Sequence, residues 1–191
     1  FGSFLKKWNI AGASVAVSEG GKLVFAKGYG LADTTDSVSV EPYHRFRIAS
    51  ISKLVTAVAI MKLCEEGKMT PGDRVFGPDG ILDDPEFSEP KDKRAFNITV
   101  THLLNHEGGW SQRYGDQMFM PHVVADAMGV PTPVSTSTIV RFALGKRLHF
   151  TPGQGRSYSN LGYSILGLVV EKVSGMGYEE YCQKNILEPL G

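Results

Sequence analysis

The sequence predicts an α+β fold, and three observations support this prediction. A β-hairpin pattern lies near the start of the chain, a long apolar helix pattern follows it, and shorter helical patterns fill much of the rest. The chain has 191 residues, which is enough for one domain with a substantial core. We find no internal repeat and no low-complexity tract in this order of elements.

Residues 1–67 are expected to hold the hairpin and the long helix. A short amphipathic helix is predicted to begin after Ser3, a plausible N-cap. Residues 13–18 and 22–29 predict two antiparallel strands, because the Glu19-Gly20-Gly21 sequence between them is typical of a tight turn. Residues 33–42 are predicted to be a polar loop.

Residues 51–64 are the most apolar stretch, with hydrophobic side chains on almost every face of the predicted helix. A helix that is apolar all round is typically buried, so this one is expected to run through the interior. Gly67, just beyond the last apolar turn, is a helix stop signal. Ser50 and Lys53 lie three residues apart at its start, so their side chains share one face.

Residues 68–157 are expected to form an insertion of loops and short helices. Four prolines and many charges within 69–94 predict a surface loop. Short helices are predicted around 102–106, 123–128 and 138–144.

Residues 158–191 are expected to begin with a turn and continue as helices. The apolar pattern over 161–173 predicts a second buried helix, which Gly175 ends. An amphipathic helix is predicted over 178–186, and the chain closes on Pro189-Leu190-Gly191.

Composition excludes some classes of partner. The 20 basic and 20 acidic residues balance, with no long run of either sign, which argues against nucleic-acid or membrane-surface binding through charge. No apolar run is long enough for a transmembrane helix. The chain starts at Phe1 and not at Met, so any signal peptide is expected to have been removed or not to be shown. Cys64 and Cys182 are too few for a disulfide framework and are predicted to be buried free thiols, so the redox compartment stays open.

Three segments match a Ser-x-x-Lys pattern, beginning at Ser3, Ser50 and Ser88, and only the one at Ser50 opens a long apolar helix. Burial there would lower the pKa of Lys53 toward neutrality, so that the amine could accept the proton of the serine. The alternative is structural, with Ser50 as an N-cap and Lys53 extending to solvent.

Tyr158-Ser159-Asn160 is the single Tyr-x-Asn sequence in the chain and precedes the second apolar helix. A phenol can pass a proton between a nucleophile and a leaving group, and a carboxamide can both donate to a substrate carbonyl and accept from a lysine. The alternative is a packed tyrosine ring and an asparagine that caps the helix.

Together these motifs resemble the penicillin-recognising serine hydrolases, in particular the branch of class C β-lactamases, DD-peptidases and esterases. The Tyr-x-Asn form departs from the Ser-Asp-Asn of the class A signature. Phe46-Arg-Ile-Ala-Ser50, the segment from Ile98 to Gly109, and the run from Pro152 through Tyr163 are similar to the same family. The resemblance extends over nearly the whole chain.

The resemblance implies a β-lactamase/transpeptidase-like fold and four site residues. Ser50 would be the acylated nucleophile, with its backbone N–H as one oxyanion donor, and Lys53 would be its proton acceptor. Tyr158 would relay the proton, and Asn160 would bind the substrate amide and Lys53. No cofactor or metal is implied, the partner would be a small-molecule or peptide substrate, and the location would be periplasmic, cell-envelope or secreted.

One part of the family pattern is missing. The third motif, a Lys- or His-x-Gly on a sheet strand, would follow the last residue, and His106-Glu-Gly108 is rejected because it ends a helix. The chain therefore resembles the N-terminal part of a longer domain whose remaining sheet strands lie in a C-terminal remainder, which would be its partner. Loss of the second oxyanion donor, about 10²–10³ in rate, would leave this part nearly inactive.

Two neighbouring groups are weaker candidates. His102 and His106 have the i, i+4 spacing of metal ligands but lack an evident third ligand, so structural roles are expected for both. By family analogy, Gln112, Arg113 and Tyr114 would border the substrate cleft.

The leading hypothesis is a serine hydrolase acting on an amide or ester, with β-lactams, D-Ala-D-Ala peptides and esters all open as substrates. The runner-up is a sensing or binding module that kept the penicillin-binding fold but does not turn over. A purely structural helical domain would require the four site residues to coincide by chance.

Overall fold

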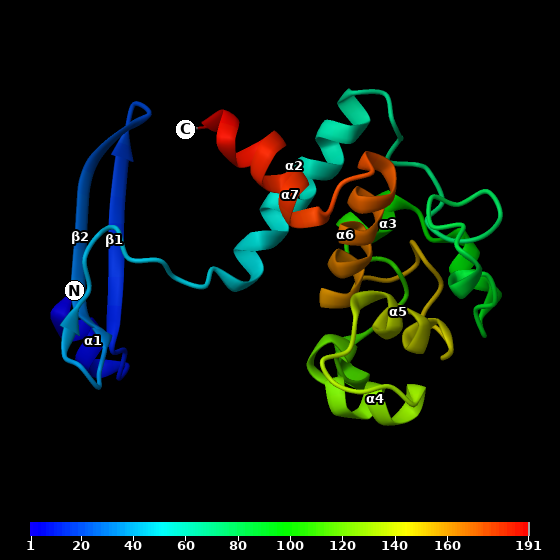
Figure 1. Ribbon diagram of the computed structural model, residues 1–191, viewed down its shortest axis with the longest axis horizontal. Helices are drawn as coiled ribbons and strands as arrows, with labels where there is room; N and C mark the ends of the chain where they lie inside the picture. Colours follow the sequence, from blue (N-terminus) through cyan, green and yellow to red (C-terminus); the bar gives the residue numbers. More distant parts are fainter. Residues whose placement is uncertain (191) are drawn as a thin grey trace. The chain divides into compact units, whose positions relative to one another are not determined.

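A computed structural model describes residues 1–190, and the chain divides into two compact units, Phe1–Ala49 and the part from Ser50 onward (Figure 1). The first unit holds the strands, and the second is mainly helical. The predicted α+β class is therefore confirmed. Division of one domain at residues 67 and 157 stays a proposal, and the last residue of the predicted Pro189-Leu190-Gly191 ending lies outside the described residues.

The first unit is a three-stranded antiparallel sheet in the order β1-β2-β3. Strand β1 (Gly12–Glu19) pairs with β2 (Lys22–Asp33) through a turn at Gly20 and Gly21, where both residues have positive φ and glycine avoids a steric cost. Strand β3 (Val38–Ser39) pairs with the end of β2 inside the segment predicted to be loop. Its two residues are too short a pattern for a sequence-based prediction.

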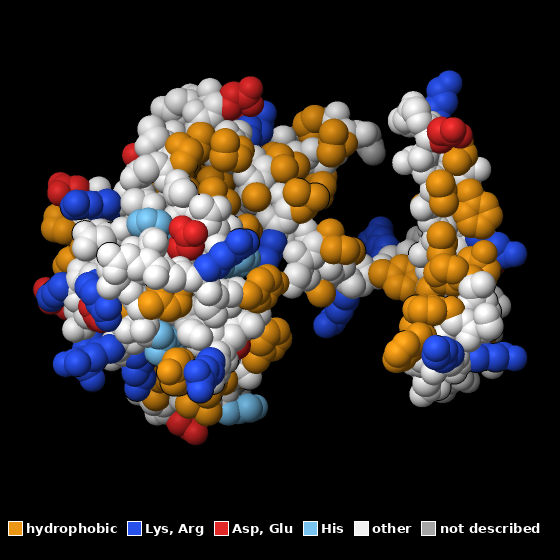
Figure 2. Space-filling view, turned by 180° about the vertical axis from the view of Figure 1, so that it is seen from behind, with side chains coloured by type: hydrophobic (Ala, Val, Ile, Leu, Met, Phe, Trp, Pro, Cys, Tyr) orange, Lys and Arg blue, Asp and Glu red, His pale blue; other side chains and the backbone are white. Residues whose placement is uncertain are grey.

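Helix α1 (Gly2–Lys7) begins before Ser3, so the prediction that Ser3 caps this helix is wrong. Phe1 is the N-cap and offers no side-chain hydrogen bond. Within residues 1–49, the buried side chains are those of Leu5 and Val40. The sheet exposes many apolar side chains, visible along this unit in Figure 2; they include Val17, Leu23, Val24 and Phe25.

Helix α2 (Ser52–Glu65) follows a 3₁₀ turn at Ala49–Ile51 and ends before Gly67, whose φ is +69°. Two apolar side chains of this helix are not covered by the second unit, since Leu54 is 67% exposed and Met61 is 51% exposed. Burial of the helix on all faces therefore stays a prediction. One stripe is buried, and it packs on later helices of the same unit; its members are Thr56, Ala59, Ile60 and Leu63. Apolar composition predicted the helix but could not tell which faces have neighbours.

Between Ser50 and Leu190, five further α-helices are described, in the regions where helical patterns were predicted: α3 (Val100–Leu104), α4 (Pro121–Met128), α5 (Thr136–Leu144), α6 (Asn160–Ser174) and α7 (Tyr178–Cys182). Helix α6 is central, because it packs against α2, α3, α5 and α7 (Figure 1). Its buried side chains are the middle of the core, among them Leu161, Ile165, Leu166, Val169 and Val170. Helix α7 continues as a π-helical turn over Gln183–Leu187.

The long connection between α2 and α3 has no α-helix or named strand, as predicted, but it is anchored in the core through buried residues such as Val75 and Phe76. Asp92 and Arg94 tie it to the segment that leads toward Tyr158. The Asp92 carboxylate accepts from the Leu148 backbone N–H at 3.1 Å, and Arg94 donates to the Leu148 carbonyl at 3.0 Å and to Thr151 Oγ1 at 3.1 Å.

Both cysteines are free thiols, Cys182 buried and Cys64 partly buried, and burial raises the pKa of each. Within residues 1–190, no helix has the length and apolar character needed to cross a bilayer.

Candidate active site

Ser50 lies in the turn before α2 and does not cap the helix. Ile51 occupies the N-cap position, and no side chain there accepts a hydrogen bond from the helix. The capping alternative for Ser50 is therefore wrong. Ala49, just before it, has φ of +44°, a conformation that costs a non-glycine residue about 1–2 kcal/mol and occurs often at functional sites.

The Lys53 side chain turns toward Asn160 and Ser50. Its Nζ donates to Asn160 Oδ1 at 2.6 Å and to Ser50 Oγ at 3.3 Å. The ammonium also lies 4.7 Å from the centroid of the Tyr158 ring, within cation–π range. Lys53 is partly buried, so the alternative in which it simply extends into solvent is wrong.

Tyr158 contacts the same serine oxygen from the second motif. Its hydroxyl donates to Ser50 Oγ at 2.6 Å, and its ring lies 4.6 Å from the ring of His106. The pKa of Tyr158 lies below its usual value. The largest cause is hydrogen bonding with Lys53 and the next is the hydrogen bond with Ser50, because both stabilise the phenolate.

Asn160 is the first residue of α6, but the helix is capped by its neighbour. Ser159 Oγ accepts from the Gly162 backbone N–H at 3.0 Å, which supplies the N-cap bond. The capping alternative for Asn160 is therefore wrong. Its carboxamide is left to bind other side chains, with Oδ1 accepting from Lys53 and Nδ2 donating to Asp116 Oδ2 at 2.7 Å.

The four residues singled out from the sequence therefore come together around one oxygen atom. Ser50 Oγ accepts from both Lys53 and Tyr158, and Asn160 holds the far side of the Lys53 ammonium. The other two Ser-x-x-Lys matches have no such surroundings: Ser88 donates to the Pro85 carbonyl, and Ser3 lies within the short helix α1.

Asp116 is a site residue that the sequence analysis missed. Its carboxylate accepts from Asn160 and from Gln112 Nε2, the latter at 2.8 Å. An aspartate after a glycine reads as an ordinary turn residue, and Asp116 does also cap the 3₁₀ turn Gln117–Phe119. No sequence signal distinguished it from the other aspartates.

The two histidines act as hydrogen-bond acceptors for backbone groups. His102 Nδ1 accepts from Thr99 N at 3.2 Å and forms a capping box at the start of α3. His106 Nδ1 accepts from Ser159 N at 3.2 Å, which ties the end of α3 to the start of α6. Among the described residues, no group of three or more His, Cys, Asp or Glu side chains is arranged to hold a metal.

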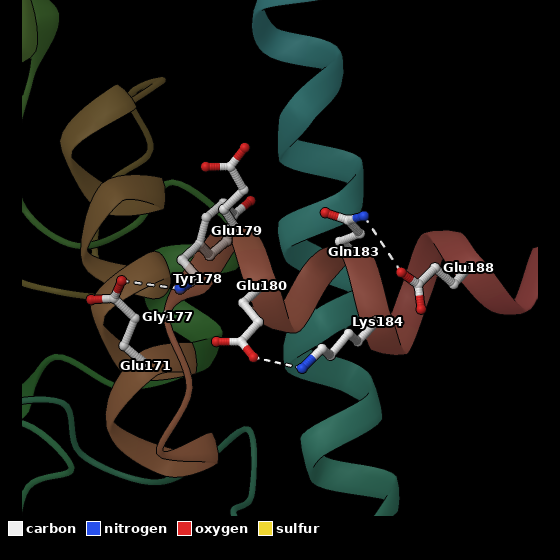
Figure 3. A pocket seen from close by; sticks show the side chains of 8 residues that line it. All are labelled: Glu171, Gly177, Tyr178, Glu179, Glu180, Gln183, Lys184 and Glu188. Carbon is white, nitrogen blue, oxygen red and sulfur yellow. Dashed lines mark hydrogen bonds and ion pairs between the residues drawn. The ribbon is translucent and has the colours of Figure 1, made fainter.

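Of the three residues expected near the cleft, Gln112 contacts the site through Asp116. Arg113 and Tyr114 are exposed in the 3₁₀ turn Gln112–Tyr114, and the Tyr114 ring stacks on His149 at 4.4 Å. A separate hollow lies where α6 meets α7, lined largely by glutamates (Figure 3). Its lysine, Lys184, is paired with Glu180 at 2.7 Å, and none of the four site residues lines it.

Comparison with known proteins identifies the class. The family model described as Beta-lactamase matches residues 1–191, so the chain belongs to the β-lactamase family of penicillin-recognising serine hydrolases. This confirms the resemblance drawn from the motifs.

Particular relatives can be named. The chain is 30% identical over 187 residues to Protein flp of Staphylococcus aureus (strain COL), covering 97% of this chain and 34% of that protein. It is 31% identical over 180 residues to Penicillin-binding protein 4* of Bacillus subtilis (strain 168), covering 93% of this chain and 36% of that one. The chain thus spans about a third of the length of these curated relatives.

Among solved structures, the octameric penicillin-binding protein homologue from Pyrococcus abyssi is similar, with a TM-score of 0.78 and 32% identity over 99% of this chain and 41% of that one. The D-amino acid amidase from Ochrobactrum anthropi SV3 shares the fold, with a TM-score of 0.74 and 24% identity over 97% of this chain and 46% of that one. The β-lactamase/transpeptidase-like fold is therefore confirmed.

Proposed function

We propose that this chain carries the acylation site of a serine hydrolase that acts on an amide or ester. The observation that supports it is the convergence of Lys53 Nζ and Tyr158 Oη on Ser50 Oγ, at 3.3 and 2.6 Å. A nucleophile with a proton acceptor in hydrogen-bond reach is the arrangement that acyl transfer requires.

In the proposed reaction, Lys53 first gives up a proton to solvent and becomes a neutral amine. Ser50 Oγ then attacks the substrate carbonyl carbon, and the serine proton passes through the Tyr158 hydroxyl to Lys53. The Ser50 backbone N–H stabilises the negative charge that develops on the carbonyl oxygen. The bond from the carbonyl carbon to the amine or alcohol then breaks, and the leaving group takes the proton. Water releases the acyl group as a carboxylic acid and restores the serine hydroxyl.

Asn160 is proposed to bind the substrate amide while it holds Lys53. β-Lactams, D-Ala-D-Ala peptides and simple esters all fit this chemistry, since each presents a carbonyl with a leaving amine or alcohol. The related proteins named above include penicillin-binding proteins, which supports an acyl-enzyme mechanism and a place in the cell envelope. A C-terminal remainder of the same domain is the proposed source of the second oxyanion donor.

The test is covalent labelling of the full-length natural protein with a fluorescent penicillin and with an activated ester. Peptide mass spectrometry is expected to find the adduct on Ser50, and the Ser50→Ala protein is expected to remain unlabelled. Labelling of another residue, or no adduct with either reagent, would contradict the proposal.

The same experiment addresses the second candidate, a sensing module that does not turn over, which the match to penicillin-binding proteins keeps open. A single burst of product equal to the protein concentration, followed by a stable adduct, would favour that candidate. Continued release of product would favour a hydrolase.

A further inference from the structure

The carboxylate of Asp116 lies behind Asn160, on the side opposite Lys53. Its Oδ2 accepts from Asn160 Nδ2 at 2.7 Å and from Gln112 Nε2 at 2.8 Å, and its Oδ1 accepts from the Met118 backbone N–H at 3.1 Å. Three donors therefore hold the carboxylate in one place, and the residue is partly buried. Asp116 contacts neither Ser50 nor Lys53 through a hydrogen bond in the described structure.

The consequence concerns which way the Asn160 carboxamide faces. A carboxamide has one end that accepts and one that donates, and the two ends are nearly the same size. An ionised carboxylate only accepts, and an ammonium only donates. Between Asp116 and Lys53, a single orientation of Asn160 satisfies both neighbours, with Nδ2 toward the carboxylate and Oδ1 toward the ammonium.

We infer that Asp116 is a positioning residue, which fixes the Asn160 carboxamide so that its oxygen holds Lys53 beside Ser50. The inference rests on the proposed function, because it assigns the purpose of this orientation to the acylation of Ser50. Asp116 itself touches no reacting atom and acts through Asn160.

The charge of Asp116 has a second effect at the site. Tyr158 contacts Lys53, Ser50 and the ring of His106. The negative charge of Asp116 also interacts electrostatically with its hydroxyl. The charge of Asp116 raises the pKa of Tyr158, against the larger lowering by Lys53 and Ser50. His106 in turn is influenced by Lys53 and Arg156, which both lower its pKa. Removal of the Asp116 charge is therefore expected to lower the pKa of Tyr158 further.

The test variant is Asp116→Asn, which keeps the shape but removes the pure acceptor. An amide at this position can present either end to Asn160, so the orientation is no longer fixed. The rate constant for acylation of Ser50 by fluorescent penicillin, in the full-length protein, is expected to fall about 10- to 100-fold, the scale of a small misplacement at a reacting centre. Asp126→Asn is the matched control, since Asp126 is exposed on α4, and it is expected to leave the rate unchanged.

A double-mutant cycle separates positioning from general damage. If Asp116 acts through Asn160, then Asp116→Asn has little effect on the rate, under about twofold, once Asn160→Ala is present. An undiminished effect in that background would overturn the inference. Thermal unfolding of each variant identifies loss of folding, and Asp116→Ser, which also removes the charge, is the second variant if Asp116→Asn unfolds.

An NMR measurement judges the inference without reference to activity. The side-chain amide signals of Asn160, assigned from their loss in Asn160→Ala, are expected to show one proton protected from exchange, and Asp116→Asn is expected to remove this protection. Unchanged signals in Asp116→Asn would overturn the inference even if Ser50 is acylated. If wild-type protein gives no adduct at Ser50, the proposed function fails, and the NMR result still decides whether Asp116 orients Asn160.

Discussion

Tyr158 donates a 2.6 Å hydrogen bond to Ser50 across 108 residues of sequence. The contact exists because α6, which begins two residues after Tyr158, packs against α2, which begins two residues after Ser50. The starts of these two helices bring the Ser-x-x-Lys and Tyr-x-Asn motifs together. The helix pair therefore sets the geometry of the site, and four variants test how that geometry works.

Lys53→Ala removes the proposed proton acceptor. Its Nζ lies 3.3 Å from Ser50 Oγ, and loss of a positioned base typically costs about 10²- to 10⁴-fold in rate. Stopped-flow acylation with fluorescent penicillin measures the change, and thermal unfolding is expected to show a folded protein. Lys62→Ala on the same helix is the control, since Lys62 forms an ion pair with Glu66 at 3.7 Å. Equal rates for both variants would exclude Lys53 as the base.

Tyr158→Phe keeps the ring against His106 but removes the hydroxyl that contacts Ser50. We expect acylation to slow by about 10²- to 10⁴-fold. The pKa of Tyr158 lies below its usual value, so the wild-type rate should rise with pH as the phenol loses its proton and can take up the serine proton on its way to Lys53. The variant should lack this limb of the pH–rate profile. Tyr43→Phe, at a tyrosine that is 79% exposed, is the control, and an unchanged profile in Tyr158→Phe would refute the relay.

His106→Asn tests a pH effect on stability. Burial, and then the charges of Lys53 and Arg156, lower the pKa of His106 below 6.5 in the folded protein. The unfolded chain therefore binds a proton first on acidification, and the free energy of unfolding should fall as the pH drops below about 6.5 until the folded-state pKa is passed.

Asparagine suits this position because it tolerates the φ of +62°. Its side-chain oxygen can also accept the hydrogen bond that the Ser159 N–H donates to His106 in the wild type. Denaturant unfolding between about pH 7 and pH 5 is expected to show a shallower fall for His106→Asn than for wild type. Parallel curves for the two proteins would exclude His106 as the titrating group.

Asp92→Asn tests the clamp that holds the segment before Tyr158. The pKa of Asp92 is lowered to about 2, and the hydrogen bond from Arg94 is the largest cause. The ionised carboxylate therefore stabilises the fold fully above pH 3.8, and this stabilisation is lost as the pH falls through about 2. We expect a loss of about 2 kcal/mol at neutral pH, the scale of a hydrogen bond to a charged group. The difference from wild type should vanish near pH 2.

Glu89→Gln is the control for Asp92→Asn. Glu89 also has a lowered pKa through its ion pair with Lys93, but it is highly exposed, so little change in stability is expected. Equal losses in the two variants would show that Asp92 has no special role.

The sequence determined much of the site because its signals are local. Ser50 and Lys53 lie one helical turn apart, and any helix beginning there places them on one face. Glycines at 67 and 175 marked two helix ends, and both have positive φ. Of the three Ser-x-x-Lys matches, the one at Ser50 accepts a hydrogen bond from Tyr158, and its role as the nucleophile stays a proposal.

The tertiary structure decided what depends on contacts between distant residues. Apolar composition predicted the helix α2, but it could not show which of its faces the second unit covers, and that unit leaves Leu54 and Met61 exposed. It also could not show that Ser159 caps α6 and leaves the Asn160 carboxamide free. The position of Asp116 at the site could be recognised from the folded chain, where its carboxylate accepts a hydrogen bond from Asn160. The role of an aspartate depends on the donors that contact it, and these are set by tertiary packing rather than by spacing in the sequence.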